Sequence, residues 1–189
     1  MTVIYFVRHA EPNYNNHNDE LRELTTKGLE DSRLVTNFLS DKAIRVVLSS
    51  PYTRSIDTIK DFADAYSHKI ETVHDFRERK IANVWIDDFK AFSKQQWEDF
   101  DYKLADGESL REVQNRNINA LNLVLNKHKD KNIVIGSHGT ALSTIISHYD
   151  SSFGYESFEV IKSLMPWIVK VTFENDVLQG IEMFDVFTK

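Results

Sequence analysis

Hydrophobic residues along this chain follow two alternating patterns: short apolar runs, and longer stretches with apolar side chains every three or four positions. A short run of β-branched or aromatic residues is typical of a buried strand, and the longer period is typical of an amphipathic helix. Residues 3–7 therefore predict a first strand, and the polar residues 12–23 predict a loop after it. The later runs predict further strands at residues 44–48, 70–73 and 133–136.

Helical periodicity accounts for most of the chain between these strands. Thr25 or Thr26 suits the N-cap of a first helix, and Pro51 lies near the first turn of a second one. A long helix begins after Gly107-Glu108-Ser109 and runs to about Lys129, and another follows residue 139. The apolar faces of the first three helices carry Leu29, Leu34, Val35, Phe38 and Leu39; Ile56, Ile59, Phe62, Ala63 and Tyr66; and Leu110, Val113, Ile118, Leu121, Val124 and Leu125.

Two segments depart from this alternation. Residues 76–102 are rich in aromatic side chains, and we interpret them as an irregular excursion with a helix at about residues 87–100, placed over the site as a lid. Residues 167–173 and 177–184 predict a closing hairpin. Strands that alternate with helices predict an α/β fold, a mostly parallel sheet with helices on both faces. We expect one domain over residues 1–189, with a short lid insertion at about residues 76–106.

Composition and charge restrict the cellular context and the ligand. Of the 189 residues, 41% are hydrophobic and 28% charged, which fits one domain with a substantial core. No apolar stretch approaches the roughly 20 residues that span a bilayer, and the first strand follows at once, so we expect neither a membrane segment nor a signal peptide. The absence of cysteine excludes disulfides and thiolate chemistry and makes a cytoplasmic location the expectation. The net charge of −6 disfavours nucleic-acid binding, and an anionic ligand would need a local basic pocket.

Three predicted strand-to-helix junctions carry the distinctive chemistry. The first strand ends in Arg8 and His9, the second junction places Arg54 in the first turn of a helix, and the last contains His138. Because the carboxyl ends of parallel strands meet at one edge of a sheet, we expect these side chains to share a site. Guanidinium groups bind phosphate oxygens in bidentate fashion, helix N-termini attract anions, and a neutral imidazole can attack phosphorus. The sequence therefore predicts a phosphoryl pocket.

Seven motifs follow one another from residue 3 to about residue 145. The first is Arg8-His9-Ala10, and its extension at Glu11 and Asn15 is the second. The others include Leu24-Thr25-Thr26-Lys27-Gly28, Ser49-Ser50-Pro51-Tyr52-Thr53-Arg54 with Thr58, Phe76-Arg77-Glu78, Gly107-Glu108-Ser109 and Ser137-His138-Gly139. In this order the motifs resemble the histidine phosphatase superfamily, also called the phosphoglycerate mutase-like family, with Pro12 in place of the family's threonine. The resemblance implies that family's three-layer α/β/α fold.

The resemblance also implies roles for the junction residues. His9 would be the nucleophile, and the phosphohistidine that it forms would then be hydrolysed by water. Arg8, Arg54 and His138 would hold the transferred phosphoryl oxygens. Neutral donors would be supplied by Asn15 and the backbone N–H of Gly139. Because arginines and helix dipoles stabilise the charge, we expect neither a metal nor a cofactor.

Glu78 would be the general acid that protonates the leaving oxygen and afterwards activates water. The family's glycine-rich continuation is missing, since Ile81-Ala82-Asn83-Val84 follows. Glu78 also has three basic neighbours, Arg77, Arg79 and Lys80. Such a run of charges is equally typical of a solvated loop, which is the alternative interpretation of this segment. Glu11 and Asp106 are weaker candidates for the acid.

The expected function is a phosphatase that hydrolyses a small phosphorylated metabolite. Three alternatives stay open: a cofactor-dependent phosphoglycerate mutase, a phosphoprotein phosphatase, and a catalytically idle module that binds a phosphorylated ligand. Mutases of the family are usually longer and carry basic residues in a larger insertion, whereas the lid here is mainly acidic and aromatic, which favours the phosphatase. The hydrophobic C-terminal hairpin is either an exposed sheet edge or the contact of a homodimer.

Overall fold

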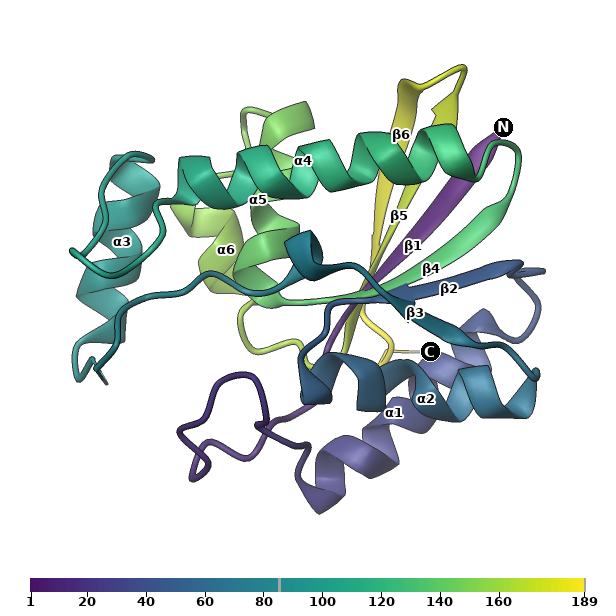
Figure 1. Cartoon of the computed structure of the whole chain (residues 1–189), viewed down its shortest axis with the longest axis horizontal. Helices are drawn as coiled ribbons and strands as arrows, with labels where there is room; N and C mark the ends of the chain where they lie inside the picture. Colours follow the sequence, from purple (N-terminus) through teal and green to yellow (C-terminus); the bar gives the residue numbers. More distant parts are fainter. Residues whose placement is uncertain (85, 189) are drawn as a thin grey trace.

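The computed structural model describes residues 1–84 and 86–188. Within this part of the chain, six strands form one sheet in the order β3-β2-β4-β1-β5-β6 (Figure 1). The strands are β1 (Thr2–Arg8), β2 (Val46–Ser49), β3 (Ile70–Thr72), β4 (Asn132–Ser137), β5 (Trp167–Glu174) and β6 (Val177–Phe184). The pairs β1–β4, β2–β4 and β2–β3 are parallel, whereas β1–β5 and β5–β6 are antiparallel. The prediction of a mostly parallel sheet with a C-terminal hairpin is confirmed.

The helices lie close to the positions that the periodicity predicts. Thr25 caps α1 (Thr26–Leu39), because its hydroxyl accepts the Gly28 N–H at 3.0 Å. A capping box formed by Ser109 and Glu112 starts α4 (Leu110–Lys127). The remaining elements are α2 (Thr53–Ala65), the 3₁₀ turn η1 (His74–Phe76), α3 (Phe89–Glu98), α5 (Gly139–Tyr149) and α6 (Tyr155–Ile161). None of the helices among the described residues combines the length and apolar character of a membrane span.

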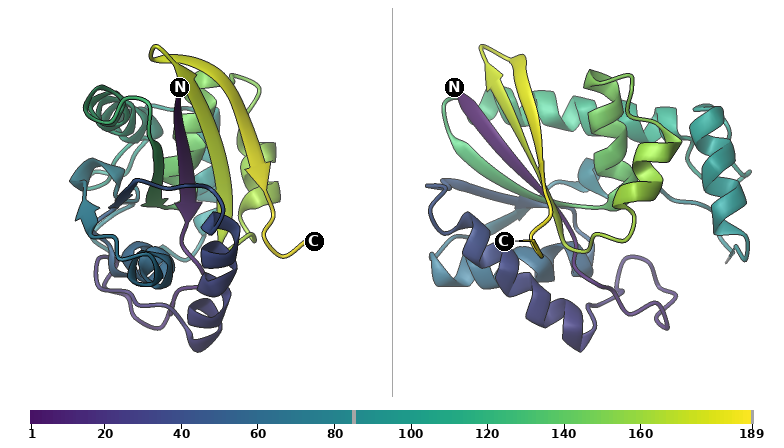
Figure 2. Two further views of the ribbon diagram at one scale, coloured as in Figure 1. Left: turned by 90° about the vertical axis from the view of Figure 1, so that its right-hand side faces the viewer. Right: turned by 180° about the vertical axis from the view of Figure 1, so that it is seen from behind.

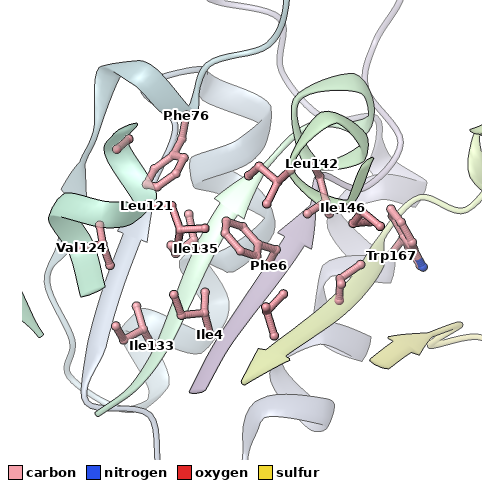
Figure 3. Packing of buried hydrophobic residues seen from close by; sticks show 14 of the residues in the cluster. Ile4, Phe6, Phe76, Leu121, Val124, Ile133, Ile135, Leu142, Ile146 and Trp167 are labelled. Atoms are coloured by element: carbon pink, nitrogen blue, oxygen red, sulfur yellow. The ribbon is translucent and has the colours of Figure 1, made fainter. Parts of the chain in front are cut away.

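Two hydrophobic cores lie on opposite faces of the sheet. Side chains alternate along a strand, so β1 contributes Ile4 and Phe6 to one core and Tyr5 and Val7 to the other. Helices α4, α5 and α6 cover the first face and α1 and α2 the second (Figures 1 and 2). In the first core, side chains from the sheet meet others from α4 and α5 (Figure 3), namely Phe6, Ile135, Leu121 and Leu142. This is the three-layer α/β/α arrangement that the sequence predicts.

The segment between η1 and α4 departs from the predicted lid in one respect. Helix α3 lies at one end of the molecule beside α6 and not across the sheet (Figure 1). Its Trp97 packs against the rings of Phe153 and Phe158, with ring centroids 6.1 and 5.6 Å apart. The chain before α3, residues 77–84, is irregular, and we call it the strap. The strap and Phe89, the first residue of α3, both line a cavity at the carboxyl ends of the strands.

The strap is held against the start of α4. The Lys80 N–H donates to Glu108 Oε2 at 2.9 Å, and the Glu108 N–H donates to the Lys80 carbonyl at 2.8 Å. At Gly107, a Cβ would lie 2.0 Å from the carbonyl oxygen of Ile81. Only glycine permits this close approach, so the Gly107-Glu108-Ser109 motif both starts α4 and fixes the strap.

Candidate active site

The carboxyl ends of β1, β2 and β4 lie together at one edge of the sheet. The register pairs Arg8 with Ser137 and Ser49 with Gly136, so the three strands end in line. Beyond the strand ends, the His9 N–H donates to the Ser137 carbonyl at 3.1 Å, and the Ser50 N–H donates to the Gly136 carbonyl at 2.9 Å. The predicted gathering of the three junctions is confirmed by this register.

His9 lines a cavity of about 1230 Å³ that opens at this edge. Its Nδ1 lies 2.8 Å from the Ala10 carbonyl oxygen, which can only accept, so Nδ1 carries the proton and Nε2 keeps the lone pair. Burial, followed by the charges of Arg54 and Arg8, holds the pKa of His9 well below its usual range. The ring is therefore a neutral imidazole whose Nε2 has the electronic form of a nucleophile.

The backbone that holds His9 is itself fixed by side chains of α2. The Ala10 N–H donates to Thr58 Oγ1 at 2.9 Å, and the Thr58 hydroxyl donates to the Arg54 carbonyl at 2.7 Å. Thr58 thus links the first junction to the second. These two bonds give a structural reason for a threonine four positions after Arg54.

Arg8 is buried, and its guanidinium lies against the C-terminal end of α6. Its Nη1 donates to the carbonyl oxygens of Ile161 at 2.8 Å and Leu164 at 3.2 Å, where the helix end carries partial negative charge. Its Nε is buried without a hydrogen-bond partner. At Gly139, a Cβ would lie 3.0 Å from this Nε, so the glycine allows α5 to approach the guanidinium closely. Arg8 therefore keeps its charge and a free donor for an anion.

Arg54 lies in the first turn of α2, as predicted, and is almost fully buried. Its guanidinium donates to the Asp19 carbonyl, and its Nη2 lies 3.1 Å from Asp19 Oδ1. The same Oδ1 is 2.9 Å from Arg22 Nη1, so one loop carboxylate pairs with two arginines and leaves a net positive charge. Burial raises the pKa of the neighbouring Tyr52 to about 12, and its phenol therefore stays protonated as a hydrogen-bond donor.

His138 is fully buried against His9, with ring centroids 5.4 Å apart. Its Nε2 lies 2.7 Å from Ser50 Oγ, and its Nδ1 is buried without a hydrogen-bond partner. Burial, followed by the charge of Arg54, holds the pKa of His138 well below its usual range. His138 is not among the described residues that line the cavity, so its contact with a phosphoryl oxygen stays a prediction.

Glu78 reaches from the strap to the first turn of α5. Its Oε2 accepts the Thr140 N–H, and its Oε1 the Ala141 N–H, both at 3.0 Å. A helix N-terminus stabilises a carboxylate through these N–H groups and the helix dipole. The Glu78 carboxylate consequently lies beside Gly139, the residue that closely approaches the Arg8 guanidinium.

The other two candidates for the acid lie elsewhere. Glu11 accepts the Thr25 hydroxyl at 2.7 Å, and Asp106 is exposed. Neither is among the described residues that line the cavity, whereas Glu78 is. The geometry therefore favours Glu78 among the three.

A single arginine of α4 holds the backbone that carries Glu78. Arg116 donates from Nε and Nη2 to the two carboxylate oxygens of Glu108, at 2.8 and 3.0 Å. The same guanidinium donates to three carbonyl oxygens at 2.7, 2.8 and 3.1 Å, those of Asp75, Arg77 and Glu78. This fork positions the strap with five charge-assisted hydrogen bonds.

The structure also corrects two interpretations. Asn15 is exposed on its loop, where its N–H donates to Asn13 Oδ1 at 3.1 Å, and it is not among the described residues that line the cavity. The alternative of a solvated charged loop is wrong for Arg79, which is buried, and for Glu78, which is partly buried.

The cavity is also lined by residues to which the sequence motifs assign no role: Asp19, Arg22, Tyr52, Arg79 and Thr140. Trp85, which belonged to the predicted lid, lies outside the described residues.

The cavity is positively charged, although the chain as a whole is negative. Among the described residues, seven Arg and Lys side chains line it against four Asp and Glu side chains. A local excess of positive charge attracts an anionic ligand at short range despite a net charge of −6. In the same part of the chain, no group of three or more His, Asp or Glu side chains gathers as a metal site.

Comparison with known proteins gives one family match over most of the chain. The sequence model of the histidine phosphatase superfamily (branch 1) matches residues 4–179. Among curated proteins, phosphohistidine phosphatase SixA from Escherichia coli (strain K12) is 32% identical over 63 residues. These residues are 32% of this chain and 39% of SixA, so the chain matches well under two thirds of that relative.

Solved structures share the fold over nearly the full length. The phosphoserine phosphatase of Entamoeba histolytica, solved with 3-phosphoglyceric acid, has a TM-score of 0.78 at 18% identity and covers 98% of this chain and 99% of its own. A mycobacterial glucosyl-3-phosphoglycerate phosphatase has a TM-score of 0.76 at 14% identity, covering 97% of this chain and 98% of its own. At these identities the likeness shows the fold alone.

Proposed function

This chain belongs to the histidine phosphatase superfamily, and on that premise we propose that it is a phosphatase acting on a small phosphorylated metabolite through a phosphohistidine on His9. The observation that carries the proposal is the state of His9. Its ring is neutral, its Nδ1 proton is held by the Ala10 carbonyl, and it lines the cavity together with Arg8 and Arg54. The phosphatase activities in the names of the similar proteins support the same reaction class.

In the first step, His9 Nε2 attacks the phosphorus while the bond from phosphorus to the leaving oxygen breaks. Arg8 and Arg54 bind the equatorial oxygens, and the Gly139 N–H and His138 complete the phosphoryl site. In the free protein the α5 N–H groups hold Glu78 as a carboxylate. It takes up a proton as the phosphate anion binds beside it, and gives that proton to the leaving oxygen, which departs as an alcohol. The products of this step are the alcohol, a phosphohistidine and the Glu78 carboxylate.

In the second step, water attacks the phosphohistidine. The Glu78 carboxylate takes a proton from that water, the N–P bond breaks, and inorganic phosphate leaves. His9 returns to its neutral form and Glu78 to its protonated form. The strap supplies Glu78 from outside the strand junctions, so acid and nucleophile come from separate elements.

The first test is phosphate release by the wild-type protein and by His9→Ala. We expect His9→Ala to lose at least about a thousandfold in kcat/KM with p-nitrophenyl phosphate, because the nucleophile is removed. Rapid quenching with labelled substrate should trap an acid-labile phosphoryl group on the wild type alone. His148→Ala, an exposed histidine away from the cavity, is the matched control. Equal rates for wild type and His9→Ala would refute the proposal.

The alternative of a phosphoglycerate mutase predicts different products. We expect 3-phosphoglycerate with bisphosphoglycerate to yield inorganic phosphate and little 2-phosphoglycerate. Robust formation of 2-phosphoglycerate without net phosphate release would replace the phosphatase by the mutase.

A phosphoprotein phosphatase is the second candidate, and the size of the cavity favours it. Its volume of about 1230 Å³ exceeds the roughly 300–1,000 Å³ typical of small-molecule sites. The local likeness to SixA, whose name is phosphohistidine phosphatase, points the same way. Comparing kcat/KM for a panel of phosphorylated metabolites with that for phosphopeptides separates the two. A higher kcat/KM for the peptides would favour this second candidate.

A further inference from the structure

One residue of the loop after β1 contacts both terminal nitrogens of Arg54. The Nη1 of Arg54 donates to the backbone carbonyl of Asp19, and its Nη2 lies 3.1 Å from the Asp19 carboxylate. Arg54 is 2% exposed, so a partner of opposite charge offsets the cost of burying its guanidinium. Two acceptors on one residue fix the plane of the guanidinium as well as its charge. We call these two contacts the Asp19 clamp.

The loop that carries the clamp is docked on the first turn of α2 through its backbone. The Thr53 N–H donates to the Glu20 carbonyl at 3.0 Å. Thr53 precedes Arg54 and Glu20 follows Asp19, so the loop and the helix meet at two successive residues of each. The Thr53–Glu20 bond involves no side chain. The loop therefore presents the Asp19 carboxylate to Arg54 from a fixed backbone.

Arg22 holds the Asp19 carboxylate from a second direction. Its Nη1 donates to Asp19 Oδ1 at 2.9 Å, and its Nε donates to the Asn16 carbonyl at 2.8 Å. The Tyr14 ring lies against the same guanidinium, with its centroid 5.6 Å from Cζ. Arg22 is 8% exposed, whereas the Asp19 side chain is 42% exposed. The carboxylate of a surface loop is thus fixed between two buried arginines.

Arg54 keeps donors for a ligand beside His9. The clamp engages at most two of the five N–H groups that a guanidinium carries. Arg54 and His9 both line the cavity, and among the charges around His9 that of Arg54 has the largest effect on its pKa. The guanidinium that the clamp orients is therefore electrostatically coupled to the proposed nucleophile.

We propose that Asp19 is a positioning residue of the phosphoryl site, which acts through Arg54 by holding the plane of its guanidinium while the remaining N–H groups bind the phosphoryl oxygens. Bidentate binding of a phosphate depends on orientation as well as charge. A guanidinium that is already oriented binds more tightly than one that the ligand must order. This inference rests on the proposed function, because it places the phosphoryl group at Arg54.

Electrostatic repulsion alone predicts the opposite effect of Asp19. A carboxylate in the cavity repels a phosphate anion, and one that competed with the phosphate for Arg54 would weaken its binding further. Under either of these roles, removal of the carboxylate tightens phosphate binding. If Asp19 positions Arg54, removal weakens it. The direction of the change in affinity therefore separates the clamp from both other roles.

Calorimetric titration of the intact protein with inorganic phosphate measures this direction. We expect Asp19→Ala to raise the dissociation constant about 5- to 50-fold, because the ligand must then order Arg54. Asp19→Glu returns a carboxylate and should recover part of the affinity. The matched control is Glu20→Ala, which removes the neighbouring carboxylate of the same cavity. Glu20 forms no ion pair with a described residue, so this variant should bind phosphate at least as tightly as the wild type.

A double-mutant cycle with Arg54→Lys identifies the residue through which Asp19 acts. Lysine keeps a positive charge but has no plane to orient, so in this background Asp19→Ala should weaken phosphate binding less than about threefold. Equal losses in the two backgrounds overturn the proposal. Unchanged or tighter binding by Asp19→Ala, or an equal loss in Glu20→Ala, also overturns it. If Asp19→Ala unfolds, Asp19→Asn decides by the same criteria, since asparagine suits a loop of this kind and lacks the charge.

Phosphate binding is measured without turnover, so this test is separate from that of the proposed function. A wild type that binds phosphate in the expected pattern of variants, yet releases none from any ester, keeps the clamp and refutes the phosphatase. A wild type that releases phosphate from esters while Asp19→Ala binds phosphate as tightly keeps the phosphatase and refutes the clamp. Absence of phosphate binding in the wild type overturns the clamp as well.

Discussion

Arg8 and His9 are neighbours in the chain, and both are buried, yet one is charged and the other neutral. Burial is the first cause that lowers the pKa of each. For His9, whose ordinary pKa is near neutrality, the result is a neutral ring, and the charges of Arg54 and Arg8 act in the same direction. For Arg8, whose ordinary pKa lies far above neutral pH, the guanidinium stays charged. Burial thus makes the His9 ring neutral, while Arg8 stays a cation despite its burial.

At the residue scale, Glu78→Gln tests the proposed acid through the leaving group. Glycerol 3-phosphate needs a proton on its leaving oxygen, whereas p-nitrophenolate departs without one. We expect kcat for glycerol 3-phosphate to fall about 10²- to 10⁴-fold and kcat for p-nitrophenyl phosphate to fall much less. Glu11→Gln, at a carboxylate bonded to Thr25, is the control and should change neither. An equal fall for both substrates would show that Glu78 is not the acid.

At the element scale, the ends of two helices and one side chain of a third complete the site. The C-terminal end of α6 accepts hydrogen bonds from Arg8, the N-terminus of α5 binds Glu78, and α4 holds the strap through Arg116. Helix ends leave backbone groups without partners inside the helix, so they are natural places for such contacts. The motif around Glu108 therefore acts on the site indirectly, by holding Arg116.

The close contact between α5 and Arg8 leads to a prediction at the same scale. In Gly139→Ala, the new Cβ would lie 3.0 to 3.2 Å from the guanidinium of Arg8, which the α6 carbonyls prevent from moving freely. We expect kcat/KM to fall roughly 3- to 30-fold, because small misplacements of positioning groups are costly. Gly154→Ala is the matched control, since a Cβ there has no neighbour within 4 Å. Steady-state kinetics of both variants check this, and equal activity would contradict the close contact.

At the scale of the whole molecule, the sheet topology decides which side chains lie together at the site. The parallel strands bring their carboxyl ends to one edge, and the antiparallel β5–β6 pair extends the sheet away from the site. Strand β6 is the last strand of the sheet and exposes Val177 and Met183. An edge of this kind suits pairing with a second chain. The homodimer stays a prediction, which sedimentation or light scattering would test.

The two buried histidines make the stability of the whole molecule depend on pH. Burial depresses the pKa of His9 and His138 in the folded state below the ordinary value of 6.5. Above that pH both the folded and the unfolded chain keep these rings neutral. As the pH falls below it, the unfolded chain takes up protons that the folded chain excludes, so the free energy of unfolding decreases. The free energy of unfolding then falls by up to about 1.4 kcal/mol per pH unit for each ring.

Urea unfolding at about pH 7.5 and about pH 5.5 measures this decrease. His9→Gln should lose roughly 1 kcal/mol less stability over that interval than the wild type, because one titrating ring is gone. His148→Gln, at an exposed position, should behave like the wild type. A stability that is constant or rises toward pH 5.5 would contradict the buried neutral state of the two rings.

Much of the fold and part of the site follow from the sequence alone. Apolar periodicity locates β1, β2, β4 and the long helices, and the parallel-strand rule then brings Arg8, His9 and Arg54 to one edge. The same information misses α6, whose seven residues are too few to show a clear period. Local patterns are sufficient where a side chain's position depends on its own strand or helix.

Only the tertiary structure decides the remaining features. Glu78 meets α5 across 62 positions of the chain, and Arg79 donates a hydrogen bond to a glutamine 17 positions later. Asn15 matches a family motif, yet its loop leaves it exposed outside the cavity. Such placements depend on contacts between segments that carry no common periodicity, so no local pattern encodes them. The sequence by itself determines that Arg8, His9 and Arg54 meet at one edge of the sheet, because each lies at or shortly after the end of a parallel strand, and the packing of the strap on α4 and α5 decides where Glu78 and Arg79 lie.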